Sequence, residues 1–332
     1  ADPARYYKGG KPDLQLFDKK LYEVNPDDKV AIARAAAEEV LGKDERIISV
    51  DSSYSDGEGS SYRLISNGFE GESKSTWFSV SASVSIKGEG EARPQDYWYD
   101  SALFYDKLTK TGIGAKALER VLRKLGQKKA KSGKYTMVVD PMNVGNLLSP
   151  MLSALYGSAL QQKNSFLMDK LDTKVASDLF TLRDEPHAIG ANGSRYFDNE
   201  GVATEPRTVF DKGVLKTYFI DTYNGKKMDI APTISAPSRL ILTPGDKDLN
   251  GLVADIKQGI LVTGFNGGNS NSSTGDFSYG IEGFLIEDGK LTQPVNEMNV
   301  TGNMVTLWNS LVAVGNDPQP NRSWPVSYTH LT

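Results

Sequence analysis

The chain has 332 residues, a formal net charge of −4, a pI near 5.4, no cysteine and two histidines. The lack of cysteine excludes disulfides, thiolate nucleophiles and zinc–sulfur sites, and an acidic chain without a basic face argues against direct binding to nucleic acid. No stretch approaches the roughly 18 consecutive apolar residues of a membrane helix. We therefore expect a soluble protein, long enough for two domains of about 100–200 residues each.

The first part of the chain predicts a unit of helices and strands. Residues 1–20 are polar and aperiodic, and Asp27 or Asp28 can cap a helix that ends near Gly42. Three strands are expected over residues 47–54, 61–67 and 76–87, and the last alternates apolar residues with serines, as a sheet with one solvent-facing side does. The apolar stripe of the first helix is expected to contain Val30, Ala33, Ala37, Val40 and Leu41, and that of a second helix Leu118, Val121, Leu122 and Leu125.

The segment 128–134 is the expected domain boundary, because it is polar, charged and contains glycine. We predict one domain over residues 1–130 and a second over residues 131–332. The lysines at positions 128, 129 and 131 are interpreted as a solvated helix end, where cations suit the helix dipole.

The second part of the chain predicts mostly antiparallel strands with a few helices. Asp211-Lys212-Gly213 is a hairpin signal, and a short strand is expected over residues 135–140. A helix is expected to begin near Pro150, because proline inside a helix costs about 3 kcal/mol but suits the first turn after a serine cap. The predicted fold class is therefore α+β, with a helix–strand domain followed by a β-rich domain.

Residues 263–276 are rich in glycine, asparagine and serine, and this composition predicts a long loop shaped by turn chemistry. Strand-forming residues follow, and Asp288-Gly289 predicts a tight hairpin turn. Residues 304–311 have helical spacing. The glycines are followed by neither the Lys-Ser/Thr of a phosphate-binding loop nor a dinucleotide-binding spacing, which excludes both kinds of site here.

Several ordered segments resemble one family. NSNSSTGDFSYGIEGFLIEDGK, PVNEMNVTGNM and AVGND are similar to the C-terminal signature of the TldD/PmbA family, a group of peptidase-related proteins. The resemblance continues upstream through SGKYTMVVDP, GSALQQKNSFLMDKLDTKVAS, LRDEPH, FDNEGVAT and GVLKTYFIDTYNGKKM, and covers about residues 25–324. Family members carry a further N-terminal region, so the resemblance implies a truncated start. The C-terminal SYTHLT, which contains His330, departs from it.

The resemblance also implies where a metal site would lie. Catalytic members carry a HExxxH zinc motif, and the flanking similarity places it across residues 149–154, where this chain has Ser149, Pro150 and Ala154 at the three motif positions. The cysteine that completes the family's site is also missing. The chain is therefore similar to the PmbA (TldE) branch, for which no metal is expected in the chain itself and zinc is expected only in a partner subunit.

The residues themselves leave few catalytic candidates. His187 is the one histidine within the family-like region, and one histidine with carboxylates makes a poor zinc site. The carboxylates of Asp198, Glu200, Asp276 and Glu282 could converge in a cleft, as they do in hydrolases. The simpler interpretation of Asp198 and Glu200 is a turn whose side chains bond to their own backbone.

The function implied by the resemblance is that of a non-catalytic subunit in a cytoplasmic peptidase system, also associated by name with modulation of DNA gyrase. Its expected partners are a TldD-like metal-bearing subunit, or a second copy as a dimer, and an extended peptide held through exposed strand edges. Two alternatives stay open: a stand-alone hydrolase with a site around His187, and a non-enzymatic β-rich peptide-binding module.

Overall fold

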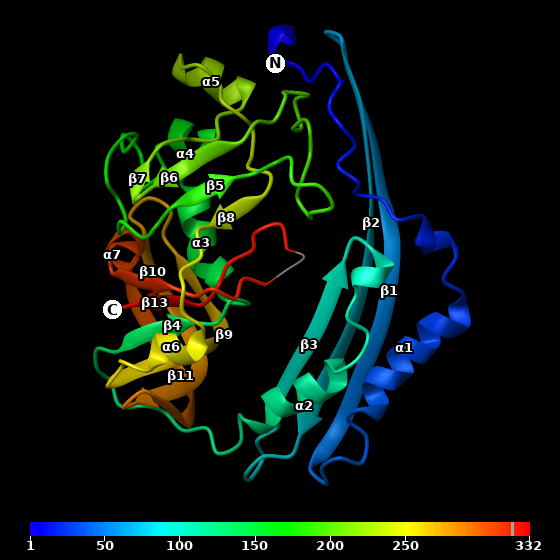
Figure 1. Ribbon diagram of the computed structural model, residues 1–332. Coiled ribbons are helices and arrows are strands. Elements are labelled where there is room, and N and C mark those ends of the chain that lie inside the picture. Colours follow the sequence, from blue (N-terminus) through cyan, green and yellow to red (C-terminus); the bar gives the residue numbers. More distant parts are fainter. Residues whose placement is uncertain (320–321) are drawn as a thin grey trace.

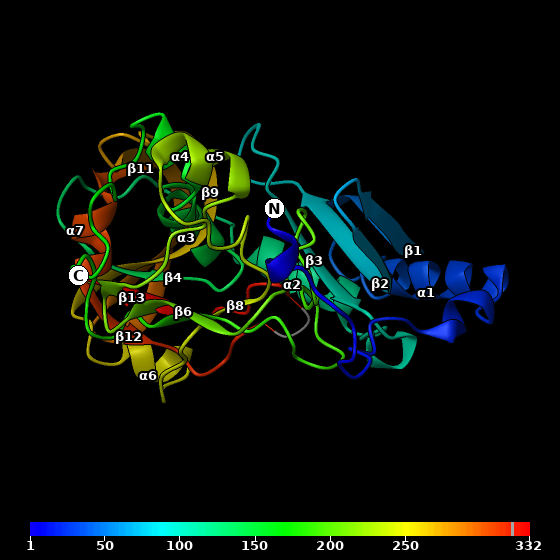
Figure 2. The same ribbon diagram turned by 90° about the horizontal axis from the view of Figure 1, so that it is seen from above.

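A computed structural model describes residues 1–319 and 322–332. A helix-and-sheet unit lies on one side and a larger β-rich unit on the other, and the N-terminal arm runs along the first unit (Figure 1). The first unit is a three-stranded antiparallel sheet with two helices on one face (Figure 2). Its elements are α1 (Pro26–Glu38), β1 (Ile47–Ile65), β2 (Phe69–Ile86), β3 (Gln95–Ala102) and α2 (Ile113–Leu122), with short 3-10 turns at Pro3–Arg5, Lys19–Tyr22 and Tyr105–Lys107.

The alternating pattern of β2 behaves as predicted. Its apolar side chains are buried under the helices, and its serines lie on the opposite face; the buried members are Phe78, Val80, Ala82, Val84 and Ile86. The prediction of two separate strands before β2 is wrong, because β1 runs unbroken through the Ser55–Gly59 segment. Gly57 pairs with Trp77 in a continuous register, so the long partner strand overrides the local turn signals.

The stripe predicted for α1 is partly wrong. Val30 is 55% exposed and Leu41 is 58% exposed, whereas Ala36 and Val40 are buried. The reason is the close approach of α2: a Cβ on Gly114 would lie 1.9 Å from the carbonyl oxygen of Ala36. Two small residues therefore set which side of α1 faces the core.

The β-rich unit contains a six-stranded and a four-stranded sheet. The six-stranded sheet has the order β11-β10-β9-β4-β13-β12, with bounds β4 (Thr136–Val139), β9 (Gln258–Ser270), β10 (Asp276–Glu287), β11 (Lys290–Asn303), β12 (Leu311–Val314) and β13 (Thr329–Leu331). The four-stranded sheet has the order β7-β6-β5-β8, with bounds β5 (Leu182–Asp184), β6 (Arg207–Asp211), β7 (Val214–Leu215) and β8 (Leu240–Leu242).

In the part of the chain that the structure describes, five short helices complete this unit: α3 (Val144–Ser153), α4 (Gly157–Gln161), α5 (Thr222–Met228), α6 (Leu249–Val253) and α7 (Met304–Asn309). Among the described strands of the large sheet, only β4 and β9 pair in parallel, and all other pairs are antiparallel. The predicted α+β class is confirmed. The SYTHLT segment contributes β13, which pairs with β4 on one side and β12 on the other.

The glycine-rich stretch is mostly strand, so the predicted long loop is wrong. β9 extends to Ser270 and pairs with β10 up to the Ser270–Phe277 register position, which leaves a short connection at residues 271–275. The predicted hairpin turn is confirmed, since Asp288 and Gly289 both have positive φ, 47° and 76°, between β10 and β11.

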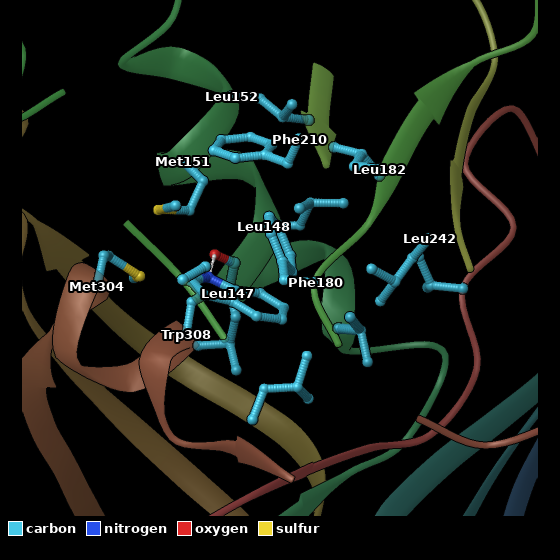
Figure 3. Packing of buried hydrophobic residues seen from close by; sticks show 14 of the residues in the cluster. Leu147, Leu148, Met151, Leu152, Phe180, Leu182, Phe210, Leu242, Met304 and Trp308 are labelled. Atoms are coloured by element: carbon cyan, nitrogen blue, oxygen red, sulfur yellow. Dashed lines mark hydrogen bonds between the residues drawn. The ribbon is translucent and has the colours of Figure 1, made fainter. Parts of the chain in front are cut away.

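Pro150 lies inside α3, so the predicted helix start is wrong. The helix instead begins at Val144, because its apolar residues at helical spacing are buried in the main core together with Phe180, Phe210 and Trp308 (Figure 3). These buried helix residues are Val144, Leu147, Leu148, Met151 and Leu152. Their burial, about 1.5–3 kcal/mol for each large side chain, outweighs the cost of the proline.

Contacts at both ends of the first sheet join the units, in addition to others such as that of Arg322 with Tyr99 of β3. At the tip of the β1–β2 hairpin, the rings of Phe69 and Phe197 lie 5.0 Å apart. At the other end, Lys124 Nζ donates to Glu282 Oε1 at 2.7 Å and lies 3.2 Å from Asp96 Oδ2. The three charged side chains are largely buried, so the orientation of the units depends on paired charges at one end and aromatic packing at the other.

Candidate functional site: a groove beside α3

A groove of about 640 Å³ lies between α3 and the far end of β9. It forms because β9 pairs with β4 only over the four positions Gly259–Val262. Asn143 Nδ2 then donates to Thr263 O at 2.8 Å, and from Gly264 onward β9 keeps only β10 as its strand partner among the described residues. The outer edge of β9 therefore faces α3 with backbone groups available for pairing.

The walls of the groove are small and uncharged. The helix presents Ser149 and Ser153, both exposed and one turn apart, beside Pro150. The other lining residues are Gly145, Asn146, Gly268, Asn269, Ser270, Ser272, Tyr279 and Trp324. None of these side chains is an acid or base that is charged at neutral pH, so the groove offers a neutral surface of hydroxyl, amide and backbone groups with the aromatic side chains of Tyr279 and Trp324.

The three positions that the resemblance assigns to the zinc motif differ in their surroundings. Ser149 and Pro150 line the groove, whereas Ala154 is buried in the core, 1% exposed, and its carbonyl oxygen accepts a hydrogen bond from Ser165 Oγ at 2.6 Å. A hydroxyl, a proline ring and a buried methyl group do not fit a zinc ion. In the part of the chain that the structure describes, no group of three or more His, Asp or Glu side chains could hold a metal ion.

His187 lies away from this groove, in the connection after β5. Its Nε2 is 3.1 Å from Thr204 Oγ1 and 3.5 Å from Lys11 Nζ, and its ring packs on Tyr196. Burial and then the Lys11 charge lower the pKa of His187, while Thr204 and the carboxylates of Glu185 and Glu205 oppose this shift. The environment favours the neutral imidazole.

His187 should make stability depend on pH. Because the folded-state pKa is lowered, the unfolded chain binds more protons near the ordinary histidine value of about 6.5, and stability is lost as pH falls from there through the folded pKa. The expected result is that a His187→Gln variant loses less thermal stability between pH 7 and the folded-state pKa than the parent chain. Parallel melting profiles of the two chains across that window would contradict the assignment.

Asp198 bonds to backbone groups of its own turn, as the turn interpretation predicts, whereas the Glu200 carboxylate bonds to Thr222 of α5 instead. Asp198 is 2% exposed; its Oδ1 accepts from the backbone N–H groups of Glu200 at 2.8 Å and Val202 at 3.0 Å, and its Oδ2 from Ser235 N at 2.9 Å. Glu200 Oε2 accepts from both the backbone and the hydroxyl of Thr222 at 2.9 Å. Both carboxylates therefore fix the connections around the four-stranded sheet.

The remaining carboxylate candidates lie at two further places. Asp276 is exposed beside the β9–β10 connection, where bonds from Asn303 Nδ2 and Thr274 Oγ1 lower the pKa of its carboxyl. Glu282 belongs to the junction with Lys124 described above. Asp198 Oδ1 accepts from the backbone N–H of Glu200, but within residues 1–319 and 322–332 no hydrogen bond or ion pair joins the side chains of any two of the five candidates, so the structure does not gather these side chains into one site.

The sequence missed the position of the groove. The residues that indicate the groove are Gly267 and Gly268, whose φ angles are 82° and 112°. A Cβ on Gly268 would lie 2.1 Å from the carbonyl oxygen of Ser278, so only glycine fits there. Such glycines inside a strand mark a bulge or a close backbone approach rather than a loop. On this interpretation the sequence would have predicted that β9 continues through Gly267 and Gly268, where the edge of the strand is free.

Comparison with known families decides what kind of protein this is. A model of the PmbA/TldA metallopeptidase C-terminal domain matches residues 132–331, and one of the PmbA/TldA metallopeptidase central domain matches residues 19–125. The chain belongs to the PmbA/TldD family. The PmbA/TldD resemblance seen in the sequence is confirmed, and the membership gives the chain a peptidase-related role.

Individual PmbA/TldD relatives agree. A metalloprotease PmbA homolog of Haemophilus influenzae is 30% identical over 92% of this chain and 68% of its own length. A crystal structure from Bacteroides thetaiotaomicron, described as a candidate modulator of DNA gyrase, is 71% identical with a TM-score of 0.99, covering 100% of this chain and 76% of that one. TldE from Thermococcus kodakarensis is 21% identical with a TM-score of 0.81, covering 100% of this chain and 77% of that one, which shows a shared fold. None of the described helices is long and apolar enough to cross a membrane.

Proposed function

We propose that this chain is the metal-free subunit of a PmbA/TldD-type peptidase system. A zinc-bearing HExxxH subunit supplies the cleavage chemistry, and this chain binds the peptide. The observation that carries the proposal is the groove itself: a free strand edge faces α3, while Ser149, Pro150 and Ala154 at the motif positions provide no zinc ligand.

The groove suits an extended peptide of varied sequence. A peptide strand laid along β9 beyond Gly264 would satisfy backbone groups that β4 no longer pairs. Because the lining residues carry no charge and most of them are small, recognition would come from the peptide backbone rather than from charged side-chain pockets. Tyr279 and Trp324 add apolar surface for occasional large side chains.

The relatives support the same proposal. The Haemophilus influenzae protein bears the name of a metalloprotease, which supports the peptidase-related part of the proposal, and TldE shares the fold. A division of labour between a zinc-bearing and a zinc-free subunit, in the cytoplasm, is the arrangement we propose for this chain.

The test measures metal and cleavage together. The chain, a HExxxH-bearing relative from the same cell, and their mixture are each assayed for zinc by mass spectrometry and for cleavage of an unstructured peptide. We expect co-elution of the two chains, zinc only in the relative, and faster cleavage in the mixture. Zinc and cleavage by this chain alone would contradict the proposal and favour a site around His187.

A groove variant tests the peptide-binding part separately. Ser149→Tyr fills the groove from the exposed face of α3, and we expect it to weaken peptide binding by about tenfold, as loss of one interface anchor of about 1.4 kcal/mol would. Ser158→Tyr is the matched control, because Ser158 is an exposed serine on the neighbouring helix α4, outside the groove. Equal binding by the two variants would place the peptide elsewhere.

A further inference from the structure

The lysine-rich segment 128–134 lies along the edge of a sheet. Its interpretation as a helix end is wrong, because α2 already ends at Leu122. Lys128 instead forms a parallel bridge with β11: Lys128 N donates to Pro294 O at 3.0 Å, and Asn296 N donates to Lys128 O at 3.2 Å. A helix end therefore does not explain why lysines are clustered in this segment.

The segment leaves this edge after one bridge. Ala130 N donates to the thioether sulfur of Met298 at 3.4 Å instead of to a strand carbonyl. β11 continues to Asn303 as an end strand of the six-stranded sheet, with β10 on its other side. In the described part of the chain, the outer edge of Glu297–Asn303 is thus free to pair with another strand.

A slot of about 430 Å³ separates the segment from the sheet at this place. Buried or half-buried apolar side chains form one part of its walls: Tyr135, Met137, Ile260, Ile281, Met298 and Val300. An open slot with such walls can receive an apolar side chain from a strand added to the edge.

The charges around the slot are mainly positive. Lys129 and Lys131 line it, Lys128 and Lys134 flank it, and all four are exposed. None of the four takes part in an ion pair within residues 1–319 and 322–332. The acidic residue among the lining positions is Glu297, so the rim carries an excess of positive charge in a chain whose net charge is −4.

We propose that this surface binds an extended acidic segment of a partner protein. The segment adds a strand to the free edge of β11, inserts an apolar side chain into the slot and sets its carboxylates against Lys129 and Lys131. The backbone edge supplies affinity, the slot selects an apolar residue, and the lysines select charge. This docking surface is distinct from the α3 groove and does not depend on the function proposed for it.

The probe is a fluorescein-labelled peptide of about seven residues, the length of strand that covers Glu297–Asn303. A phenylalanine stands at its centre with a glutamate two residues before and after it and valines at the other positions, so that the ring and both carboxylates lie on the face toward the slot and its lysines. Binding to the full chain is followed by fluorescence anisotropy. We expect binding that weakens as salt rises, and weaker binding of a lysine-for-glutamate counterpart and of a counterpart with prolines, which cannot pair along the edge.

Two double variants locate the interaction. Lys129→Glu/Lys131→Glu is expected to weaken binding by about tenfold or more, because two attractive contacts become repulsive. Lys43→Glu/Lys87→Glu is the matched control: it makes the same charge change at two exposed lysines of the first unit, and should bind within about twofold of the parent chain.

Three results of the probe experiments would overturn the proposal. They are no binding of the acidic probe, equal binding of the basic counterpart, and equal weakening by both double variants, since the last would show a general charge effect. Self-association that the Lys129→Glu/Lys131→Glu change abolishes, without probe binding, would also overturn it, because the surface would then be an interface between copies of this chain.

Discussion

Asp198→Ala is expected to lower the melting temperature by roughly 5–10 °C. The substitution leaves three backbone N–H groups, those of Glu200, Val202 and Ser235, without their acceptor in a buried turn. Unsatisfied buried donors cost about 1–3 kcal/mol each before relaxation, so a total loss of about 3 kcal/mol is expected. Differential scanning calorimetry of the parent chain and the variant measures the change in melting temperature.

Two further variants separate this structural role from a catalytic one. Asp198→Asn keeps one acceptor oxygen and should fall between the parent chain and the alanine variant. Asp276→Ala removes an exposed carboxylate from the β9–β10 connection and should leave the melting temperature almost unchanged. If Asp198→Ala melted like the parent chain but abolished peptide cleavage in the two-subunit mixture, Asp198 would be part of the catalytic machinery instead.

The sequence predicted correctly those elements whose geometry depends only on residues that are close together in the chain. Asp288-Gly289 could be assigned from two residues because a tight hairpin needs two positive φ angles, and the structure has both. The alternation of β2 could be assigned because only its apolar side meets α1 and α2. In both cases the residues that carry the signal also make the decisive contacts.

Errors arose where a distant segment determines the structure. Gly57 is in a strand because Trp77 lies opposite it, and α3 tolerates Pro150 because its buried stripe packs against residues more than twenty positions away. The free edge of β9 depends on where β4 stops, which the sequence of β9 does not contain. The sequence could have extended β9 through Gly267-Gly268 and could suggest a role for exposed strand edges, but it could not show where β4 leaves the edge of β9 free and so could not place the groove.

Trp308→Ala is expected to cost about 3–5 kcal/mol and to lower the melting temperature by roughly 10 °C. Trp308 is fully buried, its ring centroid lies 4.6 Å from that of Phe180, and its indole N–H donates to Leu147 O at 3.2 Å (Figure 3). Leu147 belongs to α3, the helix that presents Ser149 and Ser153 to the groove. The cavity left by the indole should therefore also loosen the groove wall.

The Trp308→Phe variant separates the contribution of side-chain volume to stability from that of the hydrogen bond to Leu147 O. It keeps an aromatic ring near Phe180 but removes the donor to Leu147, so a smaller loss of about 1–3 kcal/mol is expected. Trp77→Ala is the surface control, because Trp77 is 45% exposed on β2 and lies in the other unit. If Trp308→Ala reduced stability while peptide binding at the groove stayed unchanged, α3 would be held by its own apolar stripe, and the indole contact would serve the core alone.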